Sequence, residues 1–132
     1  MDLKIAYKKK LLFNIKIVEF LSLFYLSENI YKLKRVQYEF EVDKKANKVQ
    51  KINLHLTAIK SVAKHFNFDI TDDELTFLFG SQYKRKEVTK KDTIKNLRNK
   101  IVHECDIKTM EKIIEDYEFV YKPVLKKFIE IF

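Results

Sequence analysis

Residues that make tight turns are almost absent from this chain, which has one glycine and one proline among 132 residues. Domains built from short β-strands need many such turns, so a sheet-based fold is excluded. Tryptophan is missing as well, whereas 46% of the residues are hydrophobic and 35% are charged. This composition allows a core of ordinary size for one domain and predicts a single all-α domain over residues 1–132.

Cysteine is equally scarce, since Cys105 is the only one in the sequence. An internal disulfide is therefore excluded, and nothing in the sequence requires an oxidising compartment. We expect a cytoplasmic protein.

No apolar run is long and clean enough for a membrane span. Lysines followed by the apolar stretch 11–26 superficially resemble a signal peptide, but Asn14, Lys16 and Glu19 interrupt it and no small-residue cleavage site follows. We therefore expect neither secretion nor a membrane-spanning segment.

Apolar residues recur at steps of three and four in five segments, and this period predicts helices. The expected helices cover about 3–38 with a break near 27–29, 44–66, 71–80, 89–104 and 106–132. Their expected N-caps are Asp43, a Thr71–Glu74 capping box, Thr89 with Asp92, and Asp106 or Thr109. Gly80 is expected to end the short third helix, and Pro123 to kink or divide the last one.

The first helix carries apolar residues nearly all the way round its axis between positions 20 and 26. A helix of this kind needs apolar partners on two sides, either from its own bundle or from another subunit. We favour a homodimer, with an interface formed by Phe20, Phe24 and Tyr25. An amphipathic membrane contact is a weaker alternative.

Positive charge is concentrated late in the chain. The net charge is +8, and residues 83–100 contain eight basic residues against two acidic ones. Such a field attracts polyanions and makes their binding sensitive to salt. The residues expected to contact RNA are Lys84, Arg85, Lys86, Lys90, Lys91, Lys95 and Lys100. A lysine-rich solvated surface without a ligand is the alternative interpretation of the same pattern.

A rare combination of side chains lies in the same region. Arg98, Asn99 and His103 fall within about two turns of the fourth expected helix, although the chain has only three arginines and three histidines. On a helical wheel Arg98 falls inside the apolar stripe, where a guanidinium needs an anion or an acceptor. The side chains of Asn99 and His103 project together away from the core.

These residue types suit cleavage of RNA without a metal. An imidazole exchanges protons near neutral pH, so His103 can remove the 2′-hydroxyl proton or protonate the leaving 5′-oxygen. Arg98 can offset charge that develops on the phosphate, and Asn99 can orient either group. Because one histidine does not easily act as acid and base at once, two copies of the chain are expected to share a site.

The string Arg98-Asn99-Lys100-Ile101-Val102-His103 resembles the R-x4-6-H signature of HEPN domains, with the polar residue after the arginine that ribonuclease members prefer. Residues 121–129 are similar to the final helix of small HEPN proteins that pair with nucleotidyltransferases, so the likeness covers about the last forty residues.

The resemblance implies a bundle of four to five helices that dimerises so that two motifs face one cleft. It further implies metal-independent RNA cleavage with no cofactor, with Arg98 and His103 as the catalytic pair and Asn99 in support. Family members act as toxins or antiviral effectors, which makes an antitoxin or a nucleotidyltransferase a further candidate partner. At the second position after the histidine, where toxins paired with nucleotidyltransferases commonly carry a modifiable tyrosine, this chain has Cys105.

Other functional classes fit the sequence less well. A zinc site lacks a second thiol, and Gly80-Ser81 followed by Asp92 imitates a nucleotidyltransferase motif whose second carboxylate position is occupied by Ile94. The main alternative is a non-catalytic basic helical module that binds nucleic acid or a nucleotidyltransferase partner.

Overall fold

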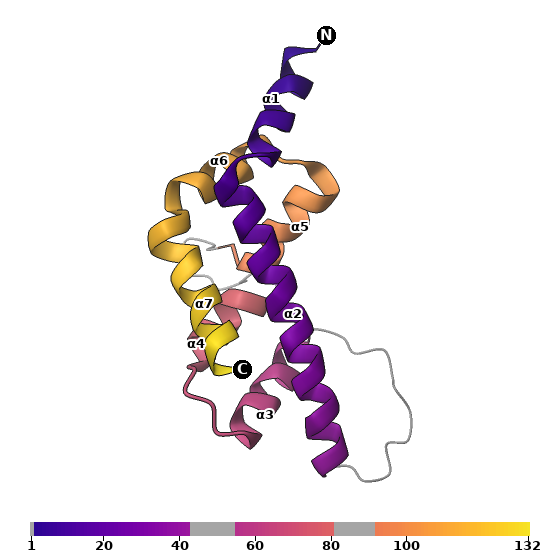
Figure 1. The fold of residues 1–132 in the computed structure, drawn as a ribbon. Helices are drawn as coiled ribbons and strands as arrows, with labels where there is room; N and C mark the ends of the chain where they lie inside the picture. Colours follow the sequence, from indigo (N-terminus) through magenta and orange to yellow (C-terminus); the bar gives the residue numbers. More distant parts are fainter. Residues whose placement is uncertain (1, 43–54, 81–91) are drawn as a thin grey trace, which may run out of the picture.

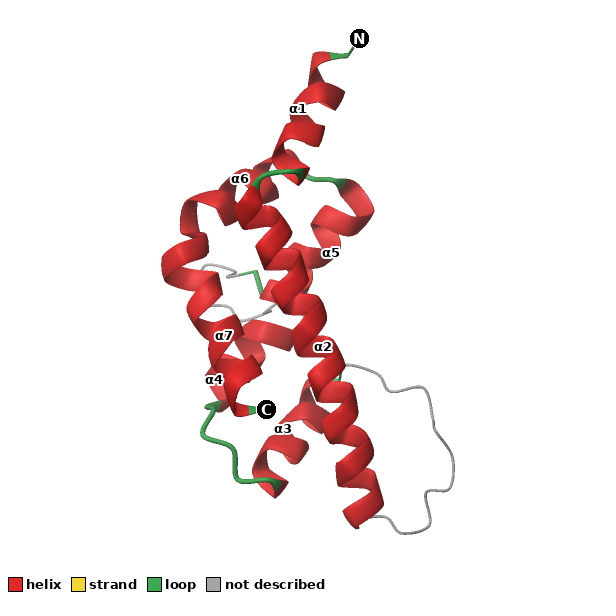
Figure 2. Ribbon diagram, in the orientation of Figure 1, coloured by secondary structure: helices red, strands yellow, loops and turns green. Residues whose placement is uncertain are grey.

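The computed structural model describes residues 2–42, 55–80 and 92–132, and all of the regular structure in these ranges is helical (Figures 1 and 2). The all-α prediction is confirmed. The elements are α1 (Leu3–Leu12), α2 (Ile15–Val42), α3 (Leu56–His65), α4 (Asp72–Phe79), α5 (Ile94–Glu104), α6 (Ile107–Asp116), the π-helical segment η1 (Tyr117–Tyr121) and α7 (Lys122–Ile131).

The first expected helix is interrupted, but earlier than the sequence suggested. The interruption lies at Phe13 and Asn14, where the Asn14 Oδ1 accepts a hydrogen bond from the Lys16 backbone N–H at 2.9 Å. The break expected near residues 27–29 is wrong. Ser27 and Asn29 instead donate their side-chain hydrogen bonds to carbonyls one turn earlier, which lets α2 continue.

The second expected helix is shorter than its apolar period predicted. His55 has an extended backbone and stands at the N-cap of α3, so a continuous helix over 44–66 is wrong at this residue. The Asp43 cap and most of the preceding segment lie outside the described residues. The apolar stripe itself is confirmed where it is described, because Ile59, Val62 and Ala63 are buried.

Several local signals behave as expected. Thr71 and Glu74 form a reciprocal capping box at the start of α4, and Asp106 caps α6. The last helix is divided near Pro123, which occupies the first turn of α7 directly after the π-helical turn. Five helical segments were expected, and the additional elements arise because the first and last are subdivided.

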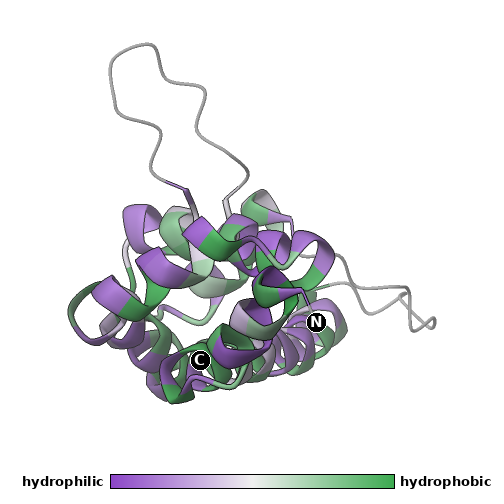
Figure 3. Cartoon of the chain, turned by 90° about the horizontal axis from the view of Figure 1, so that it is seen from above, coloured by the Kyte–Doolittle hydropathy of each residue, from purple (hydrophilic) through white to green (hydrophobic). Residues whose placement is uncertain are grey.

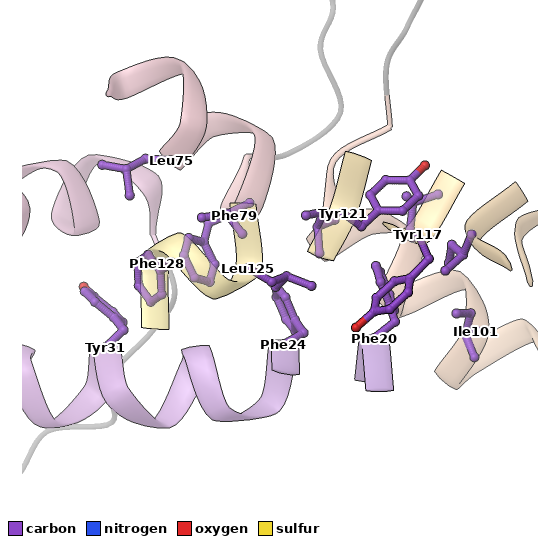
Figure 4. Close-up of a cluster of buried hydrophobic side chains, with 14 of the residues drawn as sticks. Phe20, Phe24, Tyr31, Leu75, Phe79, Ile101, Tyr117, Tyr121, Leu125 and Phe128 are labelled. Carbon is purple, nitrogen blue, oxygen red and sulfur yellow. The ribbon is translucent and has the colours of Figure 1, made fainter. Parts of the chain in front are cut away.

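The long helix α2 forms the axis of the core. It packs against α3, α5, α6 and α7, and aromatic side chains fill the space between them (Figure 4). Phe20 meets Tyr121 edge-on with ring centroids 5.7 Å apart, and Phe24 lies 5.6 Å from Phe79. Burial of such rings stabilises the fold by about 1.5–3 kcal/mol each.

This packing corrects the expected dimer interface. Phe20 and Phe24 are fully buried inside one chain, so neither side chain is available to a second copy. The chain's own helices supply the partners that the sequence argument assigned to another subunit. Tyr25, the third residue of that prediction, is 69% exposed.

Hydrophobic and hydrophilic residues are interspersed along the helices (Figure 3). Within the described residues no helix combines the length and apolar character needed to cross a membrane.

The start of α5 is tied to the end of α4. The chain leaves α4 at Gly80, where a Cβ would lie only 2.5 Å from the Thr76 carbonyl oxygen, so glycine is required. The buried Thr93 hydroxyl donates to the Gly80 carbonyl at 2.6 Å and also accepts from the Asn96 backbone N–H. Thr93 is therefore the N-cap of α5, which corrects the expectation that the helix begins at Thr89 and Asp92; Thr89 lies outside the described residues.

We expect Thr93→Ala to lower the free energy of unfolding by about 2–3 kcal/mol, because it removes a helix cap and leaves the Gly80 carbonyl without its donor. Thr93→Ser keeps the hydroxyl and should lose clearly less. Urea denaturation followed by circular dichroism measures both values. Equal losses in the two variants would contradict the capping role.

Candidate functional site

The motif helix α5 presents the predicted apolar face to the core. Ile94, Leu97 and Ile101 are buried, whereas Cys105 is half-buried and ends the helix with left-handed backbone at φ 49°. This orientation fixes where the polar residues between them point.

Arg98 lies against α2. Its Nη1 donates to Glu28 Oε1 at 2.8 Å, and its guanidinium carbon stands 4.7 Å from the centre of the Phe24 ring. Both charged side chains are largely withdrawn from solvent, with 25% of the Arg98 side chain and 12% of the Glu28 side chain exposed. The requirement for an anion at Arg98 is therefore met within the chain, by a carboxylate that the sequence analysis did not identify.

The Arg98 guanidinium is held in place, but one of its hydrogen-bond donors has no partner among the described residues. Its Nε is buried and has no hydrogen-bond partner among the described residues. The aromatic ring below it compensates part of this cost through a cation–π contact. An ion pair with little exposure and an aromatic support restricts the guanidinium to one position much more than a surface lysine would be restricted.

Asn99 and His103 line a shallow hollow on another side of α5. The hollow has a volume of about 270 Å³, and the residues around it are Asp92, Asn96, Asn99, Lys100, His103 and Glu104. His103 is exposed, so its imidazole is accessible to a ligand. The prediction that Asn99 and His103 share a groove is confirmed.

The side chains of the three motif residues therefore point in two different directions. Asn99 and His103 open into the hollow, whereas Arg98 points to Glu28 and does not line it. On a helix, Arg98 and His103 differ by about 140° in direction. One chain alone does not place the guanidinium and the imidazole around a single phosphate.

Most of the predicted RNA-contacting residues are not described. Lys84, Arg85, Lys86, Lys90 and Lys91 lie outside the described residues.

The two that remain are on α5. Lys100 forms an ion pair with Asp92 at 3.2 Å beside the hollow. Lys95 is half-buried and also interacts with another part of the chain. Asp92 therefore offsets part of the positive charge at the hollow.

Acidic groups close to the motif are tied to local partners. The hydroxyl and backbone N–H of Thr109 donate to Asp106 just after α5, and these hydrogen bonds lower the pKa of that carboxyl. Over 2–42, 55–80 and 92–132, no three metal-ligating side chains gather closely enough to hold an ion.

Glu28 is the site residue that sequence reasoning missed. Its only signal was its position, since it directly follows the uncharged and largely apolar run 20–27. Nothing in the spacing linked it to Arg98, which is 70 residues away.

We expect Glu28 and Arg98 to be coupled in a double-mutant cycle with Glu28→Gln and Arg98→Met. Each single change leaves a poorly solvated group without its partner, so the coupling should be on the order of 1–3 kcal/mol in urea denaturation.

The matched control is the Arg35–Glu39 pair, which lies on one face of α2 one turn apart. Its cycle should give about 0.3–0.5 kcal/mol. Additive effects of the Glu28 and Arg98 changes would show that the ion pair contributes nothing to the position of α5.

No family model, curated protein or solved structure matches this chain. The likeness to HEPN domains therefore rests on the motif residues of α5 and on the final helix.

Proposed function

We propose that this chain is a metal-independent endoribonuclease of HEPN type that cuts RNA at a site shared by two copies. The observation that carries the proposal is the motif helix itself, which combines an accessible imidazole at His103 with a restrained guanidinium at Arg98. Both groups come from one helix whose opposite face is anchored in the core.

The reaction needs no metal because the nucleophile is part of the substrate. One His103 imidazole takes the proton of the 2′-hydroxyl, and the 2′-oxygen attacks the neighbouring phosphorus. The bond from phosphorus to the 5′-oxygen breaks, and a second imidazolium gives that oxygen its proton. The products are a 2′,3′-cyclic phosphate and a 5′-hydroxyl end.

Arg98 would stabilise the negative charge on the non-bridging oxygens during this step. A guanidinium already fixed by Glu28 and Phe24 loses little side-chain freedom on binding the phosphate. Asn99 lies in the same hollow as His103 and would orient the phosphate or the ribose there.

Two copies are required because each chain carries one suitable histidine and directs Arg98 away from it. The biological role that fits this activity is that of a cytoplasmic toxin or antiviral effector, controlled by an antitoxin or a nucleotidyltransferase.

A non-catalytic basic module is the second candidate. The observation that favours it is the Arg98–Glu28 pair, because a guanidinium neutralised by a carboxylate is also what a purely structural role would require. Both candidates predict RNA binding that weakens with salt, and they differ in whether RNA is cut.

We expect the purified protein to cleave single-stranded RNA in excess EDTA and to leave 2′,3′-cyclic phosphate ends. His103→Ala should lower the cleavage rate by at least about 100-fold, since it removes the general acid and base, and should keep most RNA binding. Gel analysis of end-labelled RNA measures cleavage, and filter binding measures affinity.

The matched control is His55→Ala, because His55 is exposed and its side chain makes no capping hydrogen bond. This variant should cleave like the wild type. Undiminished cleavage by His103→Ala, or no cleavage by the wild type across a broad RNA panel, would favour the non-catalytic module.

A further inference from the structure

The outer face of α2 carries an apolar stripe that no described part of the chain covers. Its nine positions are Ile15, Val18, Ser22, Tyr25, Leu26, Asn29, Leu33, Val36 and Phe40, hereafter the α2 stripe. They recur at steps of three and four and lie within an arc of about 100° on the face opposite the core. An exposed helix face in a protein of this composition normally carries charges, and this one has none.

The exposed area is large for a single chain. Ile15 and Leu33 are each 72% exposed and Phe40 is 78% exposed. The seven apolar residues together expose on the order of 800 Å², which matches the share of one partner in a standard-size interface. Monomeric proteins seldom leave so much contiguous apolar surface in water.

The charges of α2 argue against a polyanion as the occupant. The helix has four basic and four acidic residues and is therefore neutral, whereas the whole chain carries +8. RNA and anionic lipid surfaces are attracted by the net positive field, which this face lacks. Two copies of a basic protein, in contrast, repel each other least where their surfaces are neutral.

The order of residues along the stripe suits a second α2 running antiparallel. When position i faces position 55 − i, Ile15 meets Phe40, Ser22 meets Leu33, and Leu26 meets Asn29. In the last two of these pairs a larger side chain faces a smaller one, as interdigitating helices require. A two-fold axis that relates identical surfaces crosses the pair between Ser27 and Glu28.

We infer that the α2 stripe is the surface through which two copies of this chain pair, antiparallel about an axis beside Glu28. The Arg98 of each copy, bonded to Glu28, then lies on the same flank of the helix pair and close to the axis. Val102, which is 60% exposed on the same α5, adds apolar surface between Arg98 and His103. The part of this inference that concerns a shared site rests on the proposed nuclease function.

The first test is the oligomeric state by sedimentation velocity over a range of concentrations. The wild type should be a dimer, and Leu33→Glu should be a monomer with an unchanged circular dichroism spectrum. Phe119→Glu is the matched control, since Phe119 is 90% exposed but lies on η1, and it should remain a dimer. A monomeric wild type, or a Leu33→Glu protein that stays dimeric, would overturn the inference.

Cysteine pairs in a Cys105→Ser background test the register. Ile15→Cys together with Phe40→Cys should form a covalent dimer on mild oxidation. Ile15→Cys alone should not, because the two copies of position 15 lie about 37 Å apart in an antiparallel pair. Efficient crosslinking through Ile15→Cys alone would show a parallel pair and contradict the proposed axis.

Cleavage assays separate this inference from the proposed function. An excess of His103→Ala protein should lower wild-type cleavage by forming mixed dimers, whereas His103→Ala combined with Leu33→Glu should not. If the stripe variants abolish the dimer but no protein cuts RNA, the pairing surface stands and the nuclease is refuted. If Leu33→Glu is monomeric and still cuts at the wild-type rate, the pairing surface again stands and the shared site is refuted.

Discussion

The fold depends on one helix that is apolar on two opposite faces. The inner face of α2 places Phe20 against Tyr121 of η1, and Phe24 against Phe79 of α4 and Arg98 of α5. These contacts help to make α2 the axis of the bundle. The outer face repeats the same period without any covering element in the described structure. Among the described residues this second face is exposed to water, and the proposed pairing of two copies would cover it.

Arg98 contacts α2 between its inner, buried face and its outer, exposed face. It packs over Phe24, which belongs to the core, and bonds to Glu28, which borders the outer face. In the proposed reaction a phosphate that approaches Arg98 would compete with Glu28 for its donors, which would link substrate binding energetically to the attachment of α5 to α2. Under the proposed function, the same pair of side chains would contribute both to stability and to catalysis.

The sequence predicted those features that are set by local interactions. Helical segments followed from the apolar period, and the capping box at Thr71 followed from residue spacing, because both depend on neighbours within a few positions. The break at Asn14 and the start of α5 at Thr93 were missed. Each depends on one side-chain hydrogen bond that competes with equally suitable caps nearby, and at Thr93 the deciding acceptor is the distant Gly80 carbonyl.

In the candidate site, too, the features set by local spacing were predicted and those set by long-range packing were not. Helical geometry places Asn99 with His103 in one hollow, so their association could be derived from four-residue spacing. The partner of Arg98 could not be derived, since Glu28 is brought to it only by the packing of α2 on α5. The predicted interface residues Phe20 and Phe24 belong to the core of the chain itself, because an apolar helix does not reveal from its sequence which side its own bundle will cover.

Charge distribution adds a constraint on how a shared site could work. Most of the net positive charge belongs to residues 83–100, whereas α2 as a whole carries no net charge. In the proposed pairing, two copies would meet at a surface without net charge, and a net positive field would not draw RNA to that surface. Under this proposal, association of the two chains and attraction of the substrate would depend on different parts of the sequence. A change of salt concentration should accordingly weaken RNA binding well before it affects a pairing based on apolar contact.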